Sequence, residues 1–311
     1  MSNWLVHRKN QWLILILLSI VWGSSFIYMK RGMEAFSTME VAALRVLIAG
    51  LAFVPFVFIK MKKHGLTENW FVYLSGMVGN LIPAFLFTKA VSGMSTGVVG
   101  VLNALTPLFA LLFGYLWLNS KVTIYNVLGI LIGIIGTYTL LVPDLEVDIS
   151  NAVEFSGYVV LATICYGFNV NLIKKKLQEV PALVITSYSL SFCAILSGIF
   201  LFAQTDFLHH LATEEKAMYS LSYTAVLGLL CTAGALYVFN ELLKSTSPIF
   251  AASCTYIIPV FALLFGLMDG EVLYFNHIVG TGIILLGVYL VNSKKSFLGK
   301  NIKQEVVNKK N

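Results

Sequence analysis

The stretch PLFALLFG at residues 107–114 returns as PVFALLFG at residues 259–266, an offset of 152 residues. Each copy lies within a long apolar segment and begins with a proline, which removes one backbone hydrogen bond from a helix. Proline-interrupted membrane helices at matching positions of two halves are typical of secondary transporters, whose binding site lies where the halves meet. The duplication therefore predicts two repeats around a central site.

The composition indicates a protein that lies within a lipid bilayer. Of the 311 residues, 58% are hydrophobic and 12% are charged, about half the charged fraction of ordinary soluble domains. The net charge of +6 could suggest nucleic acid, but the basic residues stand between the apolar segments. The four cysteines lie inside apolar segments, which argues against a disulfide framework or a cysteine-rich metal site. We expect no nucleic-acid partner, no metal and no cofactor.

Ten apolar runs are long enough to cross a hydrocarbon core of ~30 Å as helices. They cover about residues 11–29, 39–59, 70–91, 97–118, 123–142, 154–173, 182–203, 218–240, 247–268 and 272–292. Continuous rather than alternating hydrophobicity favours helices over barrel strands. The first run resembles a signal peptide, but no convincing cleavage site follows it, and we interpret it as a retained helix. The predicted fold is an all-α integral membrane protein with ten transmembrane helices.

Charges between the runs predict the orientation in the membrane. With a cytoplasmic N-terminus, the inner segments hold sixteen Lys and Arg residues and the outer segments hold three, Lys30, Arg31 and Lys216. This bias follows the positive-inside rule and places both termini in the cytoplasm, most naturally at a plasma (inner) membrane. Five helices in each half make the repeats inverted. We expect repeats at 1–150 (helices 1–5) and 151–293 (helices 6–10) and a basic cytoplasmic tail at 294–311.

The duplication extends beyond the opening stretch. Trp22-Gly23 corresponds to Tyr166-Gly167 at an offset of 144 residues, and at that offset Arg45 corresponds to Ser189. At an offset of 151, Gly129 and Gly136 correspond to Gly280 and Gly287. Small residues at this spacing let membrane helices approach closely, so we expect them to serve packing.

These features resemble the drug/metabolite transporter superfamily, specifically its EamA-type members with ten helices. The resemblance is carried by Trp22-Gly23-Ser24-Ser25-Phe26, Ala43-Leu44-Arg45-Val46, Pro107 with Pro259, and the glycine-rich fifth and tenth helices. It covers about residues 11–292. It implies that helices 1, 3, 4, 6, 8 and 9 surround a cavity, that helices 5 and 10 pack outside it, and that amino-acid-like or toxic compounds are exported. The chain departs from the family pattern at two positions. Ser120 stands where a glutamate would match Glu271, and Ser189 stands where an arginine would match Arg45.

The candidate site residues converge on the bilayer midplane. At 1.5 Å per residue, Trp22 and Pro107 lie about 15–16 Å into their helices, and Tyr166 and Pro259 about 18 Å. The two prolines are predicted hinges that free the carbonyls of Asn103 and Thr255, although kinks of this kind also occur without function. The remaining predicted substrate-binding residues are polar or aromatic and lie at similar depth: Ser25, Asn80, Thr106, Asn169 and Tyr237. Any one of them could instead join helices.

Three charged residues within or near the helices have two interpretations. Arg45 is costly at depth unless paired, and Glu40 or Glu34 could pair with it; we expect a structural pair, with a place in the transport path as the alternative. Lys89 and Glu241, at an offset of 152, lie near helix ends. Their charged groups can reach the interface, with gating as the alternative.

No motif of an enzyme is present. The sequence has no HExxH and no P-loop, and no buried carboxylate pair. We therefore expect a secondary transporter or facilitator that moves a small amino-acid-like or drug-like metabolite by alternating access and acts as an exporter. An importer is the alternative, followed by a membrane-embedded enzyme or a channel. The expected partners are the substrate and the lipid bilayer, and either a monomer or a homodimer is compatible with the sequence.

Overall fold

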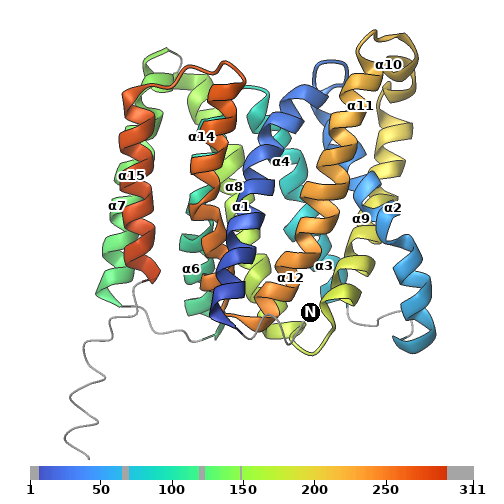
Figure 1. The fold of residues 1–311 in the computed structure, drawn as a ribbon, viewed down its shortest axis with the longest axis horizontal. Helices are drawn as coiled ribbons and strands as arrows, with labels where there is room; N and C mark the ends of the chain where they lie inside the picture. Colours follow the sequence, from blue (N-terminus) through green and yellow to red (C-terminus); the bar gives the residue numbers. More distant parts are fainter. Residues whose placement is uncertain (1–6, 65–69, 119–122, 148, 293–311) are drawn as a thin grey trace, which may run out of the picture.

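The computed structural model describes residues 7–64, 70–118, 123–147 and 149–292. All regular structure in these ranges is helical, as the continuous apolar runs predict. The helices stand side by side along a common direction (Figure 1). Ser120 and the expected tail at 294–311 lie outside the described residues.

The first half of the chain contains long helices and helical runs broken by short irregular turns. Its elements are α1 (Arg8–Gly32), α2 (Thr38–His64), α3 (Phe71–Gly76), η2 (Met77–Leu81), α4 (Ile82–Val91), α5 (Thr96–Leu102), η3 (Asn103–Leu105), α6 (Thr106–Leu118) and α7 (Ile124–Val147).

The second half has a similar order, with the short helix α10 added between α9 and α11. Its elements are α8 (Ile149–Lys176), α9 (Ala182–Gln204), α10 (Phe207–Thr213), α11 (Ala217–Val226), η4 (Leu227–Gly234), α12 (Ala235–Ser245), α13 (Pro248–Ala252), η5 (Ser253–Tyr256), α14 (Ile258–Met268) and α15 (Phe275–Asn292).

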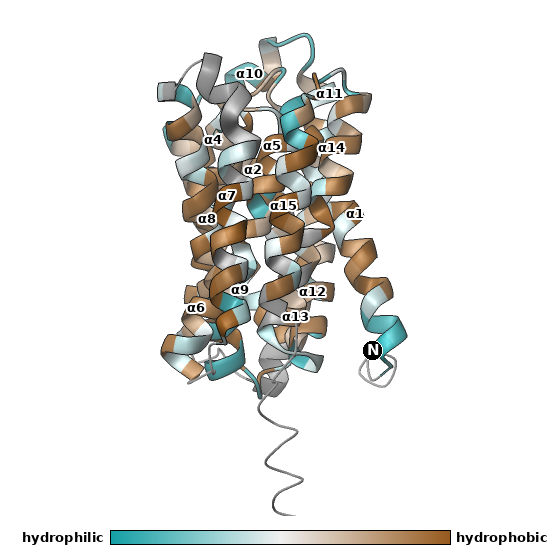
Figure 2. Ribbon diagram, turned by 90° about the vertical axis from the view of Figure 1, so that its left-hand side faces the viewer, coloured by the Kyte–Doolittle hydropathy of each residue, from teal (hydrophilic) through white to brown (hydrophobic). Residues whose placement is uncertain are grey.

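Seven helical runs in the described residues are long and apolar enough to span a membrane. Three shorter apolar helices accompany them, at Ile124–Gly136, Ile258–Met268 and Phe275–Gly287. Large apolar side chains such as Phe58 and Ile199 are 65% and 63% exposed on the outer surface, and the middle of the bundle is largely hydrophobic in Figure 2. Lipid is the solvent that matches this surface, and the protein is an integral membrane protein.

The helices α7 and α15 lie side by side at one edge of the bundle (Figure 1). A Cβ atom added to Gly136 would lie 2.7 Å from the backbone nitrogen of Ile284, and one added to Gly287 would lie 2.6 Å from the carbonyl oxygen of Gly129. Both distances are too short for a side chain. The glycines therefore allow the close approach that their spacing predicted.

Two kinds of irregular turn occur at matching positions of the two halves. The π-helical segments η2 and η4 interrupt α3–α4 and α11–α12, and the 3-10 turns η3 and η5 precede α6 and α14. The turn η3 ends two residues before Pro107 and η5 ends three residues before Pro259, close to where the sequence predicts a break. The π-helical segments carry no proline and were not predicted; such segments concentrate at functional sites.

The segment 143–153, expected to be a loop, is largely helical. Helix α7 continues to Val147 and α8 begins at Ile149. The apolar run alone defines the part of a helix inside the hydrocarbon, whereas backbone hydrogen bonds continue the helix into the polar region beyond it. Likewise, α10 forms within the segment expected to be a loop at 204–217.

Candidate functional site

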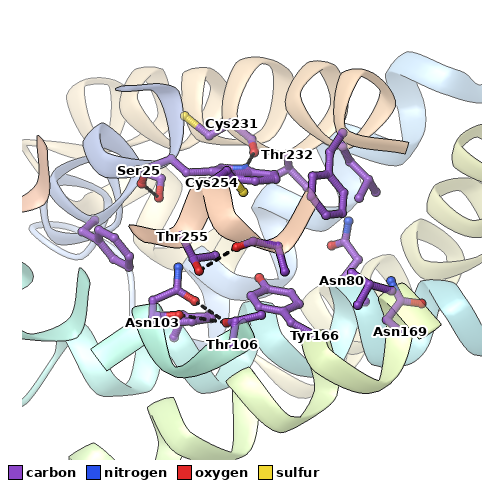
Figure 3. A pocket seen from close by; sticks show the side chains of 18 of the residues that line it. Ser25, Asn80, Asn103, Thr106, Tyr166, Asn169, Cys231, Thr232, Cys254 and Thr255 are labelled. Carbon is purple, nitrogen blue, oxygen red and sulfur yellow. Dashed lines mark hydrogen bonds between the residues drawn. The ribbon is translucent and has the colours of Figure 1, made fainter. Parts of the chain in front are cut away.

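A cavity lies in the middle of the bundle, with about 860 Å³ of space between its atoms, including the part that is open to solvent. Eight of the nine predicted substrate-binding residues line it: Trp22, Ser25, Asn80, Asn103, Thr106, Tyr166, Asn169 and Thr255. They come from α1, η2, η3, α6, α8 and η5, and Figure 3 shows several of them facing one another across the space.

Two aromatic side chains at corresponding positions form walls of the cavity. Trp22 donates its indole N–H to the carbonyl oxygen of Cys231 at 2.9 Å, and its ring centroid lies 5.3 Å from that of Phe239. Tyr166 stacks on Phe87 with ring centroids 5.7 Å apart. The hydrogen bond and the ring contacts hold these walls in place, so that a ligand meets preformed aromatic surfaces.

The glycine after each aromatic residue allows a close helix crossing between the halves. A Cβ atom on Gly23 in α1 would lie 2.6 Å from Cβ of Phe261 in α14. A Cβ atom on Gly167 in α8 would lie 2.6 Å from the carbonyl carbon and Cβ of Phe109 in α6. Phe109 and Phe261 are the third residues of the two copies of the opening stretch. The same contact is thus made twice, each time across the halves, and it brings both aromatic walls to the centre.

The turns before the two prolines present polar groups to the cavity. The Thr106 hydroxyl donates to the carbonyl of Asn103 at 2.8 Å, so that a side chain replaces the backbone donor that Pro107 lacks. In the second half, the Thr255 hydroxyl donates to the carbonyl of Ala252 at 2.8 Å. Asn103 and Thr255 both line the cavity, as predicted.

An amide from each half completes the polar lining. Asn80 lies within η2, and Asn169 accepts a hydrogen bond from the Ser75 hydroxyl at 2.7 Å. Ser25 lies one turn from Trp22 and donates to the Trp22 carbonyl at 2.6 Å. These groups make the cavity wall polar without adding charge.

Tyr237 does not line the cavity. It lies on the far side of α12 and packs against Phe53, with ring centroids 6.4 Å apart. Its depth along the helix, which matches that of the cavity residues, did not show the direction in which its side chain points. Lys89 and Glu241 also lie away from the cavity, and Lys89 Nζ stands 5.6 Å above the Phe155 ring.

The expected ion pair of Arg45 with Glu40 or Glu34 is wrong. Glu40 lies 3.0 Å from Nδ1 of His210 and, through this hydrogen bond, raises the pKa of that imidazole. Glu34 binds Lys216 at 2.6 Å and also Arg31. Arg45 instead lines the cavity. Its partners were misjudged because sequence proximity cannot show which way the guanidinium points.

An ionic network lies at one end of the bundle, between the end of α1, the start of α5 and the segment that follows α14. Asp269 binds Lys30 and Arg31, and Glu271 accepts the backbone N–H groups of Thr96 and Gly97 at the start of α5 at 3.0 and 3.2 Å. Burial raises the pKa of Asp269, but the two cations outweigh it and hold that pKa below its ordinary value. The network ties α1 and α5 in the first half to the α14–α15 segment.

Several lining residues escaped prediction. Thr232 lies 152 residues after Asn80, and the same offset relates Asn103 to Thr255. That regularity could have revealed Thr232, which lies in η4 and lines the cavity. The cavity-lining Phe87 and Phe239 are related by the same offset of 152 residues, so it could have revealed them as well. Cys231 and Cys254 carry no such signal, because they resemble ordinary apolar residues of a membrane helix.

Comparison with known proteins gives a consistent result over most of the chain. The profile of the EamA-like transporter family matches residues 10–142 and again residues 156–293. An uncharacterized transporter of Archaeoglobus fulgidus is 24% identical and covers 92% of this chain and all of its own length. The S-adenosylmethionine/S-adenosylhomocysteine transporter of Chlamydia muridarum is 23% identical, with 89% of this chain and 90% of that protein covered. The uncharacterized inner membrane transporter YedA of Escherichia coli is 25% identical, with 90% of each covered.

A solved crystal structure shares the fold. It has a TM-score of 0.66 and 17% sequence identity, and the match covers 92% of this chain and 98% of the other. At this identity the similarity concerns the arrangement of helices alone.

Proposed function

Because this chain belongs to the EamA-like transporter family, we propose that it is a secondary transporter or facilitator that exports a small organic molecule by alternating access. The observation that carries the proposal is the cavity, which is lined by polar and aromatic residues from both halves. Its irregular turns η2, η3, η4 and η5 occur in matching pairs around it. A transport site needs such a polar pocket at the depth where two repeats meet. An importer of the same fold remains the second candidate.

The architecture that we propose has ten membrane helices in two inverted repeats. The seven spanning runs and three shorter apolar helices supply ten apolar segments. The paired turns and the doubled glycine–phenylalanine crossings support an equivalence of the two halves. In this scheme the halves rock about the cavity, and the Lys30–Asp269 contact must break when that end opens.

The proposed orientation places the α10 end outside and both termini in the cytoplasm, as the loop charges favour. In a background without the four native cysteines, Glu215→Cys beside α11 should react with an impermeant thiol reagent added to intact cells. Glu179→Cys between α8 and α9 should react only after the membrane is opened. Both side chains are exposed, so access alone decides the labelling. The reverse pattern would contradict the orientation.

The test of function begins with ligand binding. Purified protein should be stabilised against thermal unfolding by its substrate, since a ligand that binds only the folded state raises the midpoint. S-adenosylmethionine belongs in the first panel because relatives are named for it. The stabilising compound should then cross liposomes that contain the protein faster than it crosses empty ones. Binding of many metabolites without any flux would contradict transport.

A further inference from the structure

Arg45 places one positive charge on the wall of the cavity. It stands on α2, its residue is 9% exposed, and its side chain lines the cavity. Every other lining residue within the described ranges is uncharged at neutral pH. The cavity therefore carries an excess positive charge on its wall.

The contacts of the guanidinium leave this charge unbalanced. Nε and Nη2 lie 3.3 and 3.2 Å from the hydroxyl oxygen of Thr232, and Nη1 lies 3.4 Å from the sulfur of Met29. The Thr232 hydroxyl donates its own hydrogen to the carbonyl of Leu227 at 2.9 Å, so its oxygen serves Arg45 as an acceptor. A guanidinium has five N–H donors. One hydroxyl and one thioether neither use them all nor supply a negative charge.

The carboxylates near Arg45 in the sequence are engaged elsewhere. Glu40 lies 3.0 Å from His210, and Glu34 lies 2.6 Å from Lys216. In the part of the chain that the structure describes, no carboxylate lies within 4.0 Å of Arg45. A cation held away from water without a counter-ion is costly. An anionic group on a ligand in the cavity would remove that cost.

The remaining walls define the rest of the ligand. Trp22, Phe87, Tyr166 and Phe239 present aromatic surfaces, and the amides of Asn80, Asn103 and Asn169 present neutral polar groups. These walls suit a flat apolar body. An ammonium group would enter the cavity beside Arg45 with no lining carboxylate among the described residues to balance it, which disfavours a zwitterion relative to a simple anion.

We propose that the transported molecule is a monoanion in which a carboxylate binds Arg45 and an aromatic or apolar body lies between the aromatic walls. This assignment rests on the proposed transport function and narrows it to a substrate class. A bidentate arginine–carboxylate pair supplies both the negative charge and acceptors for the unused donors. The ligand thus completes the pair that no described side chain provides.

Four probes on one scaffold test the charge preference. They are 3-phenylpropanoate (anion), 3-phenylpropanamide (neutral), phenylalanine (zwitterion) and phenethylamine (cation). The purified full-length protein should be stabilised most by the anion, and liposomes containing it should take up the anion fastest. S-adenosylmethionine, which carries a net positive charge, should bind more weakly than 3-phenylpropanoate.

Variants of two residues separate ligand binding from structural support. Arg45→Met should weaken binding of 3-phenylpropanoate about tenfold or more, because a charge-assisted hydrogen bond is lost. Its ligand-free thermal stability should stay equal or rise, because an unbalanced buried charge is removed. Thr232→Asp places a carboxylate beside the guanidinium, and it should raise ligand-free stability and prevent anion binding. Lys175→Met removes an exposed cation at the end of α8 and serves as the matched control with unchanged binding.

If Arg45→Met does not fold, the variant Arg45→Lys tests the charge preference instead. It keeps the charge, so the folded variant should still prefer 3-phenylpropanoate to its amide, with weaker binding than the wild type because the bidentate geometry is lost. Indifference to charge in that variant overturns the proposal. So does anion stabilisation that survives in Arg45→Met.

The failures of the two proposals are distinguishable. If the protein raises the flux of phenylalanine or phenethylamine above that of empty liposomes by as much as it raises the flux of 3-phenylpropanoate, or by more, transport stands and the substrate class is wrong. If no probe and no panel metabolite is bound or moved, both proposals are wrong.

Discussion

Replacing Gly167 with alanine is expected to destabilise the folded protein by about 1–3 kcal/mol, the usual cost of adding a group to a packed interior. The new Cβ would lie 2.6 Å from the carbonyl carbon of Phe109 and 2.7 Å from the backbone nitrogen of Ala110. Backbone atoms cannot rotate away as the end of a side chain can, so α6 and α8 must separate. Thermal or denaturant unfolding in detergent measures the loss.

Gly157 provides a matched control on the same helix. It lies in α8, and a Cβ atom there would meet no heavy atom within 4 Å. Gly157→Ala should leave stability unchanged or increase it by about 0.5–1 kcal/mol, because alanine is the better helix former. Gly23→Ala should also destabilise the protein, since the new Cβ would lie 2.6 Å from Cβ of Phe261, an atom that side-chain rotation cannot move. Equal stability of the Gly157 and Gly167 variants would show that α6 and α8 can move apart at Gly167 without a measurable cost.

Replacing either Pro107 or Pro259 with alanine is expected to slow transport while the fold and ligand binding persist. The alanine at 107 restores an N–H that can bond to the carbonyl of Asn103, which accepts the Thr106 hydroxyl at 2.8 Å. One backbone hydrogen bond of about 1 kcal/mol favours one facing state about fivefold. Flux in liposomes should fall by a similar factor or more, because the halves must bend at these turns to expose the cavity alternately.

A variant of the lining separates bending from binding. Asn103→Ala removes a polar group from the cavity wall and leaves Pro107 in place. It should reduce ligand-dependent stabilisation first, whereas the proline variants should reduce flux first. Normal flux in both proline variants would mean that the turns η3 and η5 serve only packing.

The membrane class and the residues that line much of the cavity could be predicted from the sequence. The duplicated PLFALLFG and PVFALLFG stretches placed Pro107 and Pro259 at matching depth, and a 3-10 turn ends two or three residues before each proline. Proline acts locally, through a missing donor, so its effect is present in the sequence alone. Depth along a helix is likewise a count of residues. For this reason eight of nine predicted binding residues do line the cavity.

The direction in which each side chain points around its helix axis was decided by the tertiary structure. In a membrane, lipid and protein interior are both apolar, so hydrophobic periodicity hardly distinguishes a cavity face from a packing face. For this reason the sequence did not show that Tyr237 packs against Phe53 and not into the cavity. Arg45 turned toward Thr232, a residue 187 positions away, while the nearby Glu40 turned toward His210. The π-helical segment η4 likewise contains no proline, whereas η2 is followed by Pro83, which cannot donate a backbone hydrogen bond to Gly79. The charge on the wall of the cavity thus depends on contacts between distant residues, and only the folded chain sets them.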